Sequence, residues 1–231
     1  MKRNIYFDDY IKGSGVYMLQ GAEGMGKTTF AFSIMEQMIN EDSDTHILYF
    51  HTDPLPDEID EENIDKRIRI VDTEWLAGES EEGIFLQACW MMQDHKLGMV
   101  VVDDLYELLT MTYFEYIKPS RRECVAYLLT RFKTLAELFD IPVVLIARSP
   151  DDIYEKKDEV LQIPDIKDKK LIKEFVDKII IMYTDEKYDP DTELKGISEF
   201  FLWNVRLGTK EIRRLAYIKP YSRFFSLDKN G

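Results

Sequence analysis

The sequence predicts an α/β fold, in which a mostly parallel central sheet is flanked by helices. Three observations predict it: short apolar segments alternate with longer amphipathic ones, residues 99–102 are continuously apolar, and a glycine-rich turn follows the first apolar segment. Strands that alternate with helices are typical of α/β proteins. A continuously apolar strand is typical of the middle of a parallel sheet, where both faces are covered.

Six short segments are expected to be strands because they are apolar or alternate between apolar and polar residues. In chain order they are residues 15–20, 46–50, 67–71, 99–103, 142–147 and 178–183. Three longer segments space their apolar residues as amphipathic helices do. They are residues 27–40, 81–95 and 121–140. The tail over 197–218 is expected to be a β-hairpin that turns near Gly208.

Two charged segments are expected to be loops. Residues 53–63 hold two prolines among many acids, and residues 149–177 begin with a mixed-charge stretch that suits a solvated or mobile loop. The remaining chain has no clear linker and no internal repeat. We therefore expect a single domain over 1–231, with a short N-terminal lead over 1–12.

Composition limits the classes of function. The net charge of −14 argues against a protein that grips nucleic acid over its whole surface, although it leaves room for one basic channel. No run of 18 apolar residues and no signal peptide are present, so no membrane span is expected. The two cysteines lack metal-ligand spacing, which is typical of free thiols in a reducing compartment, and a cytoplasmic location is expected.

The segment GAEGMGKT fits the P-loop (Walker A) pattern, with a strand expected before it and a helix after it. Backbone N–H groups of such a turn cradle nucleotide phosphates, and the start of the helix adds partial positive charge. Lys27 would reach the β- and γ-phosphates, and the Thr28 hydroxyl would bind Mg²⁺. We therefore expect ATP and Mg²⁺ as cofactors. The residues expected to bind the nucleotide are Gly21, Glu23, Gly24, Met25, Gly26, Lys27, Thr28 and Thr29.

An acid at the end of the apolar segment MVVVD supplies a second group for the metal. Asp103 ends this expected strand, and the carboxyl end of a buried parallel strand lies near the P-loop in such a sheet. Asp103 is expected to contact Mg²⁺ directly or through water. Asp104 is the alternative, and one of the two carboxylates would then face solvent.

Five segments that occur in one order resemble a known family: GAEGMGKTTFAFSI, HKLGMVVVDDLYEL, LTRFKTLAELFDIPVVLIARS, IPDIKDKKLIKEFVDKIIIMYTDE and GISEFFLWNVRLGTKEIRRLAYIKPYSRFFSL. Together they look like the C-terminal, RecA-like ATPase domain of DnaB-type replicative helicases. The P-loop is shared by many families, whereas the hairpin followed by YIKPYSRF is more telling. The resemblance implies a hexameric ring, ATP between neighbouring subunits, and single-stranded DNA in the central channel.

The resemblance also implies roles for individual residues. Lys27 and Thr28 match the P-loop pair of the family, and Asp103 matches its metal-binding acid. Arg206 falls where the family places the arginine finger that enters the neighbouring subunit's site. A guanidinium suits that role because it can meet two phosphate oxygens at once. The alternative for Arg206 is a solvated charge on the hairpin.

Two departures from the family concern the hydrolytic site. The family has a glutamate that polarises the attacking water, and Asp53 stands there instead, with a side chain shorter by roughly 1.5 Å. Glu58 is a substitute that no spacing argument favours. Arg148 replaces a glutamine that senses the γ-phosphate. It would contact phosphate or pair with Asp103, or with the acids of the next loop, Asp151 and Asp152.

Further departures concern assembly. Asn204 stands where the family has a lysine two residues before the finger arginine. Only about a dozen residues precede the first expected strand, so the primase-contacting N-terminal domain has no counterpart and the linker helix is absent or vestigial. These features weaken the expectation of a stable homo-oligomer.

Contacts with DNA and with the nucleobase are less clear from the sequence. The stretch 149–170 aligns with a loop that faces the channel, but its acids outnumber its lysines and Tyr154 is its only aromatic residue. A solvated or mobile loop is therefore favoured over a DNA contact. Tyr221 and Arg223 could bracket an adenine ring, although packing of a C-terminal strand explains Tyr221 equally well.

Two functions follow. The leading one is an ATPase of the DnaB-helicase type that acts on single-stranded DNA. The alternative is a regulatory or accessory ATP-binding module with weak hydrolysis and no helicase activity, which the acidic charge, Asp53, Arg148 and Asn204 favour.

Overall fold

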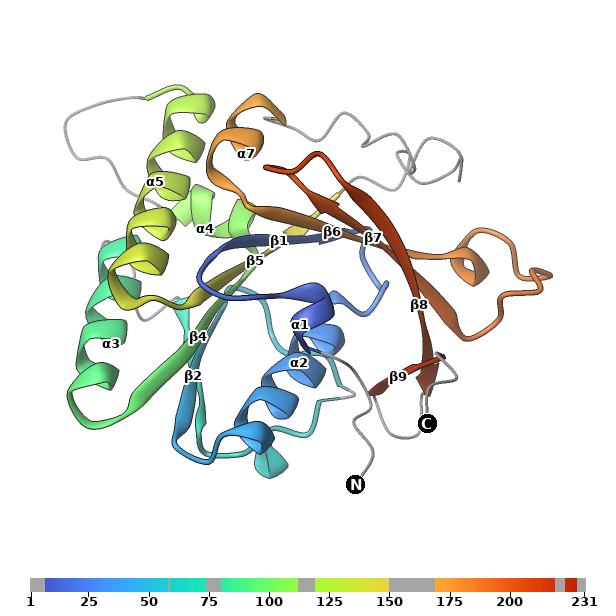
Figure 1. The fold of residues 1–231 in the computed structure, drawn as a ribbon, viewed down its shortest axis with the longest axis horizontal. Coiled ribbons are helices and arrows are strands. Elements are labelled where there is room, and N and C mark those ends of the chain that lie inside the picture. Colours follow the sequence, from blue (N-terminus) through green and yellow to red (C-terminus); the bar gives the residue numbers. More distant parts are fainter. Residues whose placement is uncertain are drawn as a thin grey trace.

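The computed structural model describes residues 7–57, 59–73, 80–111, 119–149, 169–218 and 223–227. In this part of the chain, nine strands form one sheet with helices on both faces (Figure 1). The strands are β1 (Gly15–Gly21), β2 (Thr45–His51), β3 (Ile68–Asp72), β4 (Lys96–Asp103), β5 (Pro142–Arg148), β6 (Lys178–Thr184), β7 (Ile197–Asn204), β8 (Lys210–Ile218) and β9 (Arg223–Ser226). The helices are α1 (Phe7–Tyr10), α2 (Lys27–Glu41), α3 (Ser80–Asp94), α4 (Leu105–Met111), α5 (Arg121–Phe139) and α7 (Lys169–Phe175), with 3₁₀ helices η1 (Glu61–Asn63) and η4 (Asp185–Lys187).

The sheet has a parallel part and an antiparallel extension. The strand order is β3-β2-β4-β5-β1-β6-β7-β8-β9. All pairs from β3 to β6 are parallel, and β7, β8 and β9 are added antiparallel. Strand β1 lies between β5 and β6, so the turn that follows it is at the centre of the parallel part. The carboxyl ends of these strands meet at one edge, where ligands bind in open α/β sheets.

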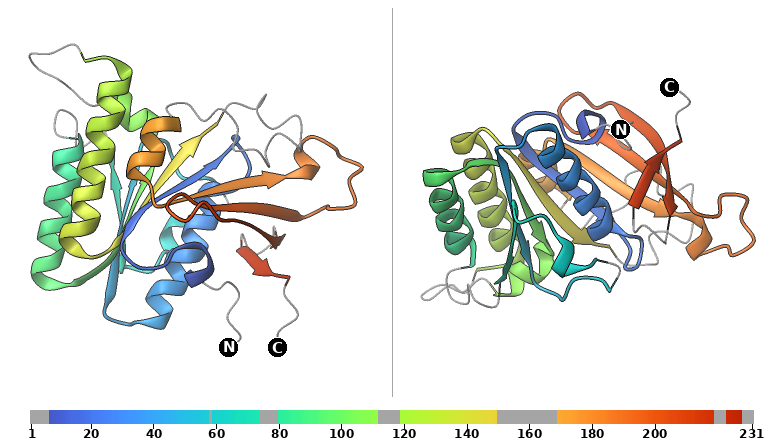
Figure 2. Two further views of the ribbon diagram at one scale, coloured as in Figure 1. Left: turned by 45° about the horizontal axis from the view of Figure 1, so that its top comes forward. Right: turned by 90° about the horizontal axis from the view of Figure 1, so that it is seen from below.

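Two apolar layers hold the sheet. Figure 2 shows α3 and α5 side by side on one face and α2 on the other. Along β4, Val100 and Val102 join the cluster under α3 and α5, whereas Met99 and Val101 join the cluster under α2. Side chains of a strand alternate between faces, and both faces of β4 are covered. This explains why its sequence is continuously apolar.

Local signals determine where the long helix α5 begins and ends. The Ser120 hydroxyl accepts a hydrogen bond from the Glu123 amide at 3.4 Å, and the Glu123 carboxylate accepts one from the Ser120 amide at 2.7 Å. This reciprocal capping box stabilises a helix start. The helix ends at Asp140, whose φ of 53° is left-handed. Aspartate is one of the few residues that tolerate this conformation.

The structure confirms the predicted α/β class and shows each expected strand and long helix. It differs in three places. Helix α4 and helix α7 were not expected, and α7 lies inside the charged segment 149–177 that was expected to be a loop. Strand β9 adds to the hairpin. Short helices depend on tertiary packing more than on local pattern, which explains the first two differences. None of the helices in the described ranges is both long and apolar enough to cross a membrane.

Candidate nucleotide-binding site

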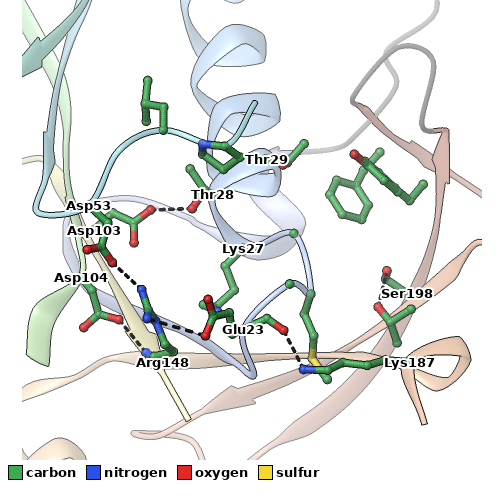
Figure 3. Close-up of a pocket in the computed structure, with 18 of the residues that line it drawn as sticks. Glu23, Lys27, Thr28, Thr29, Asp53, Asp103, Asp104, Arg148, Lys187 and Ser198 are labelled. Carbon is green, nitrogen blue, oxygen red and sulfur yellow. Dashed lines mark hydrogen bonds and ion pairs between the residues drawn. The ribbon is translucent and has the colours of Figure 1, made fainter. Parts of the chain in front are cut away.

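A cavity of about 930 Å³ lies at the carboxyl ends of the parallel strands. The P-loop between β1 and α2 forms its floor, and Figure 3 shows Asp53, Asp103, Asp104 and Arg148 on one side of it. Lys187 and Ser198, from the antiparallel part of the molecule, lie on the other side. The cavity therefore joins the parallel part of the sheet to its antiparallel extension.

The P-loop has the backbone that its glycines predict. Gly24 and Gly26 have φ values of 73° and 83°, in the left-handed region that glycine adopts at no steric cost. Gly26 is the residue before α2, and no side chain caps the helix start. The first N–H groups of α2 are therefore available to an anion, and the helix dipole favours negative charge there.

Lys27, the first residue of α2, is nearly buried at 8% exposure. Its Nζ donates a hydrogen bond to the carbonyl oxygen of Ala22 at 2.8 Å, across the loop. Burial lowers the pKa of the Lys27 ammonium to about 8, although the nearby carboxylates of Asp103 and Asp104 act in the opposite direction. An anion in the loop would replace the water that this ammonium has lost.

Thr28 and Asp103 meet although they are 75 residues apart in the chain. The Thr28 hydroxyl donates to Asp103 Oδ2 at 2.6 Å, and the Tyr49 hydroxyl donates to the same oxygen at 2.8 Å. Burial, together with the Asp103 carboxylate, raises the pKa of Tyr49 well above its ordinary value, so this phenol stays a donor. A hydroxyl and a carboxylate are hard oxygen ligands, and the pair therefore fits Mg²⁺.

Asp104 does not face solvent, contrary to one alternative from the sequence. It follows a cis peptide bond from Asp103 and is 4% exposed. Its carboxylate accepts hydrogen bonds from the backbone amides of Tyr106 at 2.6 Å and Arg148 at 2.8 Å. Burial raises its pKa, and these two hydrogen bonds oppose the shift. Through them Asp104 joins β5 to α4, and Asp103 is the aspartate that meets Thr28.

Asp53 and Arg148 form an ion pair at the mouth of the cavity. Arg148 Nη2 lies 2.5 Å from Asp53 Oδ2, and Arg148 Nη1 lies 3.8 Å from the Glu23 carboxylate. The expected pairing of Arg148 with Asp103 is not among its contacts in the described residues, whereas Asp151 and Asp152 lie outside them. Glu58 lies outside them as well. The structure therefore brings both departures from the family pattern into one contact.

The opposite wall was missed by the sequence analysis. Lys187 Nζ donates to the carbonyl oxygen of Glu23 at 2.7 Å, and Tyr217 and Phe224 line the cavity with their rings 5.0 Å apart. A Cβ on Gly26 would approach the Phe224 ring to 3.3 Å. Strand β9 therefore packs its aromatic residue against the P-loop, and no local pattern in the sequence indicated this contact.

Arg223 does not line the cavity, unlike its neighbour Phe224. Its guanidinium pairs with the Glu36 carboxylate of α2 at 2.8 Å. Adjacent residues of a strand point to opposite faces, so only one of the two can face the nucleotide. The expected bracket around adenine is not formed by Arg223 in this conformation, and Tyr221 lies outside the described residues.

Arg206 lies at the other end of the sheet. It follows β7 and pairs with Asp177, which also accepts a hydrogen bond from the Val16 amide at the start of β1. Lys133 of α5 completes this group at 3.3 Å from Asp177. Because the P-loop follows the opposite end of β1, Arg206 does not reach the cavity of its own chain. Its role in a neighbouring site stays a prediction.

The candidate DNA-contacting residues give no basic surface in the described part. Arg214 pairs with Glu199 at 2.8 Å, and Arg213 pairs with Glu211 at 2.6 Å. The stretch 150–168, which holds most of the lysines of the candidate loop, lies outside the described residues.

Comparison with known proteins agrees with this site. A family model described as the DnaB-like helicase C terminal domain matches residues 64–226. This range includes Asp103, Arg148 and Arg206 and begins after the P-loop. The chain is 27% identical to the replicative DNA helicase DnaB of Geobacillus stearothermophilus over 60% of this chain and 30% of that protein. It is 23% identical to the DnaB of Haemophilus influenzae over 94% of this chain and 52% of that protein. The chain therefore spans about a third to a half of these relatives.

Two solved structures share the fold. One is an isolated ATPase domain, which superposes with a TM-score of 0.74 at 18% identity, over 93% of this chain and 85% of that one. The other is a DnaB-like replicative helicase, studied for its interactions with primase. It superposes with a TM-score of 0.71 at 19% identity, over 93% of this chain and 57% of that one.

Proposed function

Because the chain belongs to the DnaB-like helicase C-terminal domain family, we propose that it binds ATP with Mg²⁺ in this cavity and hydrolyses it. The observation that carries the proposal is the hydrogen bond between Thr28 and Asp103. A P-loop without a nearby acid would be a phosphate-binding turn alone. Here the acid at the end of β4 meets the P-loop hydroxyl, as a metal-assisted phosphoryl site requires.

Each wall of the site has a part in binding. The amides of the P-loop and the Lys27 ammonium hold the β- and γ-phosphates. Thr28 and Asp103 hold Mg²⁺, which would neutralise charge on the phosphate oxygens when bound. Tyr49 keeps the Asp103 carboxylate aligned through its hydrogen bond. Tyr217 and Phe224 offer apolar ring surface to the base and sugar on the opposite wall.

Asp53 is the base in this proposal. Its carboxylate takes a proton from water, the water oxygen bonds to the γ-phosphorus, and the bond from that phosphorus to the β–γ bridging oxygen breaks. The products are ADP and phosphate. Asp53 lines the cavity on the same side as Asp103, which supports its assignment.

Hydrolysis would be coupled to single-stranded DNA in an assembly of several copies. Curated relatives are named replicative DNA helicases, and Arg206 is 66% exposed at the end of the sheet away from its own cavity. An exposed arginine in that place is available to the site of a neighbouring copy. Asp177 would hold it until the neighbour docks.

A second function is favoured by one observation. The only described carboxylate in the place of the base is already paired with Arg148. With a net charge of −14, this pair supports a regulatory ATP-binding module that hydrolyses slowly and unwinds nothing.

ATP turnover with and without single-stranded DNA separates the two functions. Wild type and Lys27→Ala are compared at low and moderate salt, and light scattering gives the mass of the particle. A helicase-type motor shows turnover that DNA stimulates and that Lys27→Ala reduces by at least about 100-fold. Turnover that DNA leaves unchanged at low salt, from a monomer, favours the regulatory module. If wild type binds no ATP, both functions are wrong.

A further inference from the structure

We propose that the Asp53–Arg148 pair is a switch that detects the γ-phosphate: Arg148 holds Asp53 until a triphosphate binds, then moves to the γ-phosphate and frees Asp53 to act as the base. The proposal rests on the proposed function, because it assigns a regulatory role within the same site. It concerns residues that pair with each other in this chain.

The backbone of Arg148 is held beside the P-loop. Arg148 is the last residue of β5 and is paired with Gly21, the last residue of β1. Its amide donates to Asp104 Oδ2 at 2.8 Å, and the following amide, of Ser149, donates to the Gly21 carbonyl at 3.1 Å. The start of this side chain is therefore fixed next to the loop that cradles the phosphates.

The side chain of Arg148, by contrast, is held weakly. It is 44% exposed, and its partners are more exposed still: Asp53 at 55% and Glu23 at 77%. Ion pairs in water contribute little because solvent screens them and both side chains lose rotamer freedom. A γ-phosphate carries more charge than one carboxylate and can accept two parallel hydrogen bonds from a guanidinium. The guanidinium therefore gains by leaving Asp53 when that phosphate is present.

The other cations of the cavity are already engaged. Of the described lining residues, three are cationic: Lys27, Arg148 and Lys187. Lys27 lies within the P-loop, and Lys187 donates to the Glu23 carbonyl on the opposite wall. Arg148 is the cation that stands between the P-loop and the base.

Pairing with Arg148 also decides when Asp53 can act. A carboxylate oxygen that accepts from a guanidinium has fewer lone pairs free for the proton of a water molecule. When Arg148 leaves, those lone pairs are available. The water proton then passes to Asp53, the water oxygen bonds to the γ-phosphorus, and the bond to the bridging oxygen breaks to leave ADP and phosphate. ADP has no γ-phosphate, so the pair stays closed after release of the product phosphate.

Calorimetry with ADP and with the non-hydrolysable analogue AMPPNP, both with Mg²⁺, tests the switch. We expect Arg148→Gln to weaken AMPPNP binding about tenfold, because one charge-assisted contact is lost, and to change ADP binding less than threefold. The matched control is Arg69→Gln, an exposed arginine of β3 outside the cavity lining. Because the backbone amide of Arg148 contacts Asp104, the substitution retains that link between β5 and β4.

Asp53→Asn supplies a second readout that a merely structural role would not move. The amide cannot hold Arg148 by charge, so we expect AMPPNP to bind about threefold more tightly than to wild type while turnover is lost. In the Asp53→Asn background, Arg148→Gln should again weaken AMPPNP binding alone.

The outcomes distinguish the switch from the function on which it rests. If wild type binds neither nucleotide, the proposed function is wrong and the switch with it. If wild type binds both, but Arg148→Gln weakens ADP and AMPPNP equally or leaves both unchanged, the switch alone is wrong. If Asp53→Asn weakens AMPPNP binding, Arg148 does not exchange between the two partners and the switch is again wrong.

Discussion

Two regions of the cavity lie side by side and are held in different ways. The phosphate-binding region, residues 21–28 with Tyr49 and Asp103, uses buried hydrogen bonds: Tyr49 is fully buried and Lys27 is 8% exposed. The neighbouring Asp53–Arg148 pair uses an ion pair whose side chains are 55% and 44% exposed. Buried hydrogen bonds are costly to break, whereas exposed ion pairs rearrange easily.

This difference teaches which part of the site is ready before the ligand arrives. The phosphate-binding region has its glycine conformations, its lysine and its Thr28–Asp103 contact in place without a nucleotide. The Asp53–Arg148 pair must change before Asp53 can reach a water molecule. Binding is therefore preorganised, and hydrolysis depends on a rearrangement.

The largest expected effect is at Asp103 in the phosphate-binding region. Asp103→Asn keeps the shape of the side chain and removes its charge, so we expect Mg²⁺-dependent turnover to fall by at least about 100-fold. The measurement is the rate of phosphate release against Mg²⁺ concentration. Asp104→Asn is the control: it should lower the thermal midpoint, since a buried acceptor of the Tyr106 or Arg148 amide is lost, and keep the Mg²⁺ response. Equal loss in both variants would remove Asp103 from metal binding.

A smaller effect, in the opposite direction, is expected at Asp53. Asp53→Glu extends the carboxylate by one methylene toward the γ-phosphate, and we expect turnover to rise about tenfold, because misplacement of a base by about an ångström is costly. Steady-state turnover at saturating ATP measures it. Asp57→Glu, at an exposed position of the same loop outside the cavity lining, should leave the rate unchanged. An unchanged rate in Asp53→Glu would exclude Asp53 as the base.

The smallest effect is a proton taken up by Lys27. Burial lowers its pKa to about 8 in the free protein, so its ammonium destabilises the nucleotide-free fold below that pH, and this penalty disappears as the pH rises past it. Bound phosphates favour the charged form. We therefore expect nucleotide binding to take up roughly half a proton at pH 8 and about a tenth at pH 7, and affinity to fall above pH 8.

Calorimetry in two buffers with different heats of ionisation measures this uptake. Lys27→Arg is the control, because a guanidinium stays protonated throughout this range. If wild type shows the same uptake as Lys27→Arg at pH 8, the ammonium is not the group that meets the phosphates.

The phosphate-binding region was predicted from the sequence, and most of what faces it was not. The P-loop is contiguous, and Asp103 ends a continuously apolar strand, so both were visible in local pattern. Tyr49 also lies in a predicted strand, but nothing local indicates that its hydroxyl reaches Asp103. Lys187 and Phe224 come from the antiparallel extension, whose place beside the P-loop depends on the order of strands in the sheet.

By itself, the sequence determined the α/β class, the P-loop and the acid at the end of β4, because periodicity and spacing are properties of neighbouring residues. Only the tertiary structure decided that Asp104 turns inward while Asp103 meets Thr28, that Phe224 packs on Gly26, and that Asp53 pairs with Arg148. The Asp53–Arg148 contact joins residues 95 apart in the chain. Such contacts arise where strands β2, β4, β5 and β1 end at one edge of the sheet, and that order is set by packing over the whole chain.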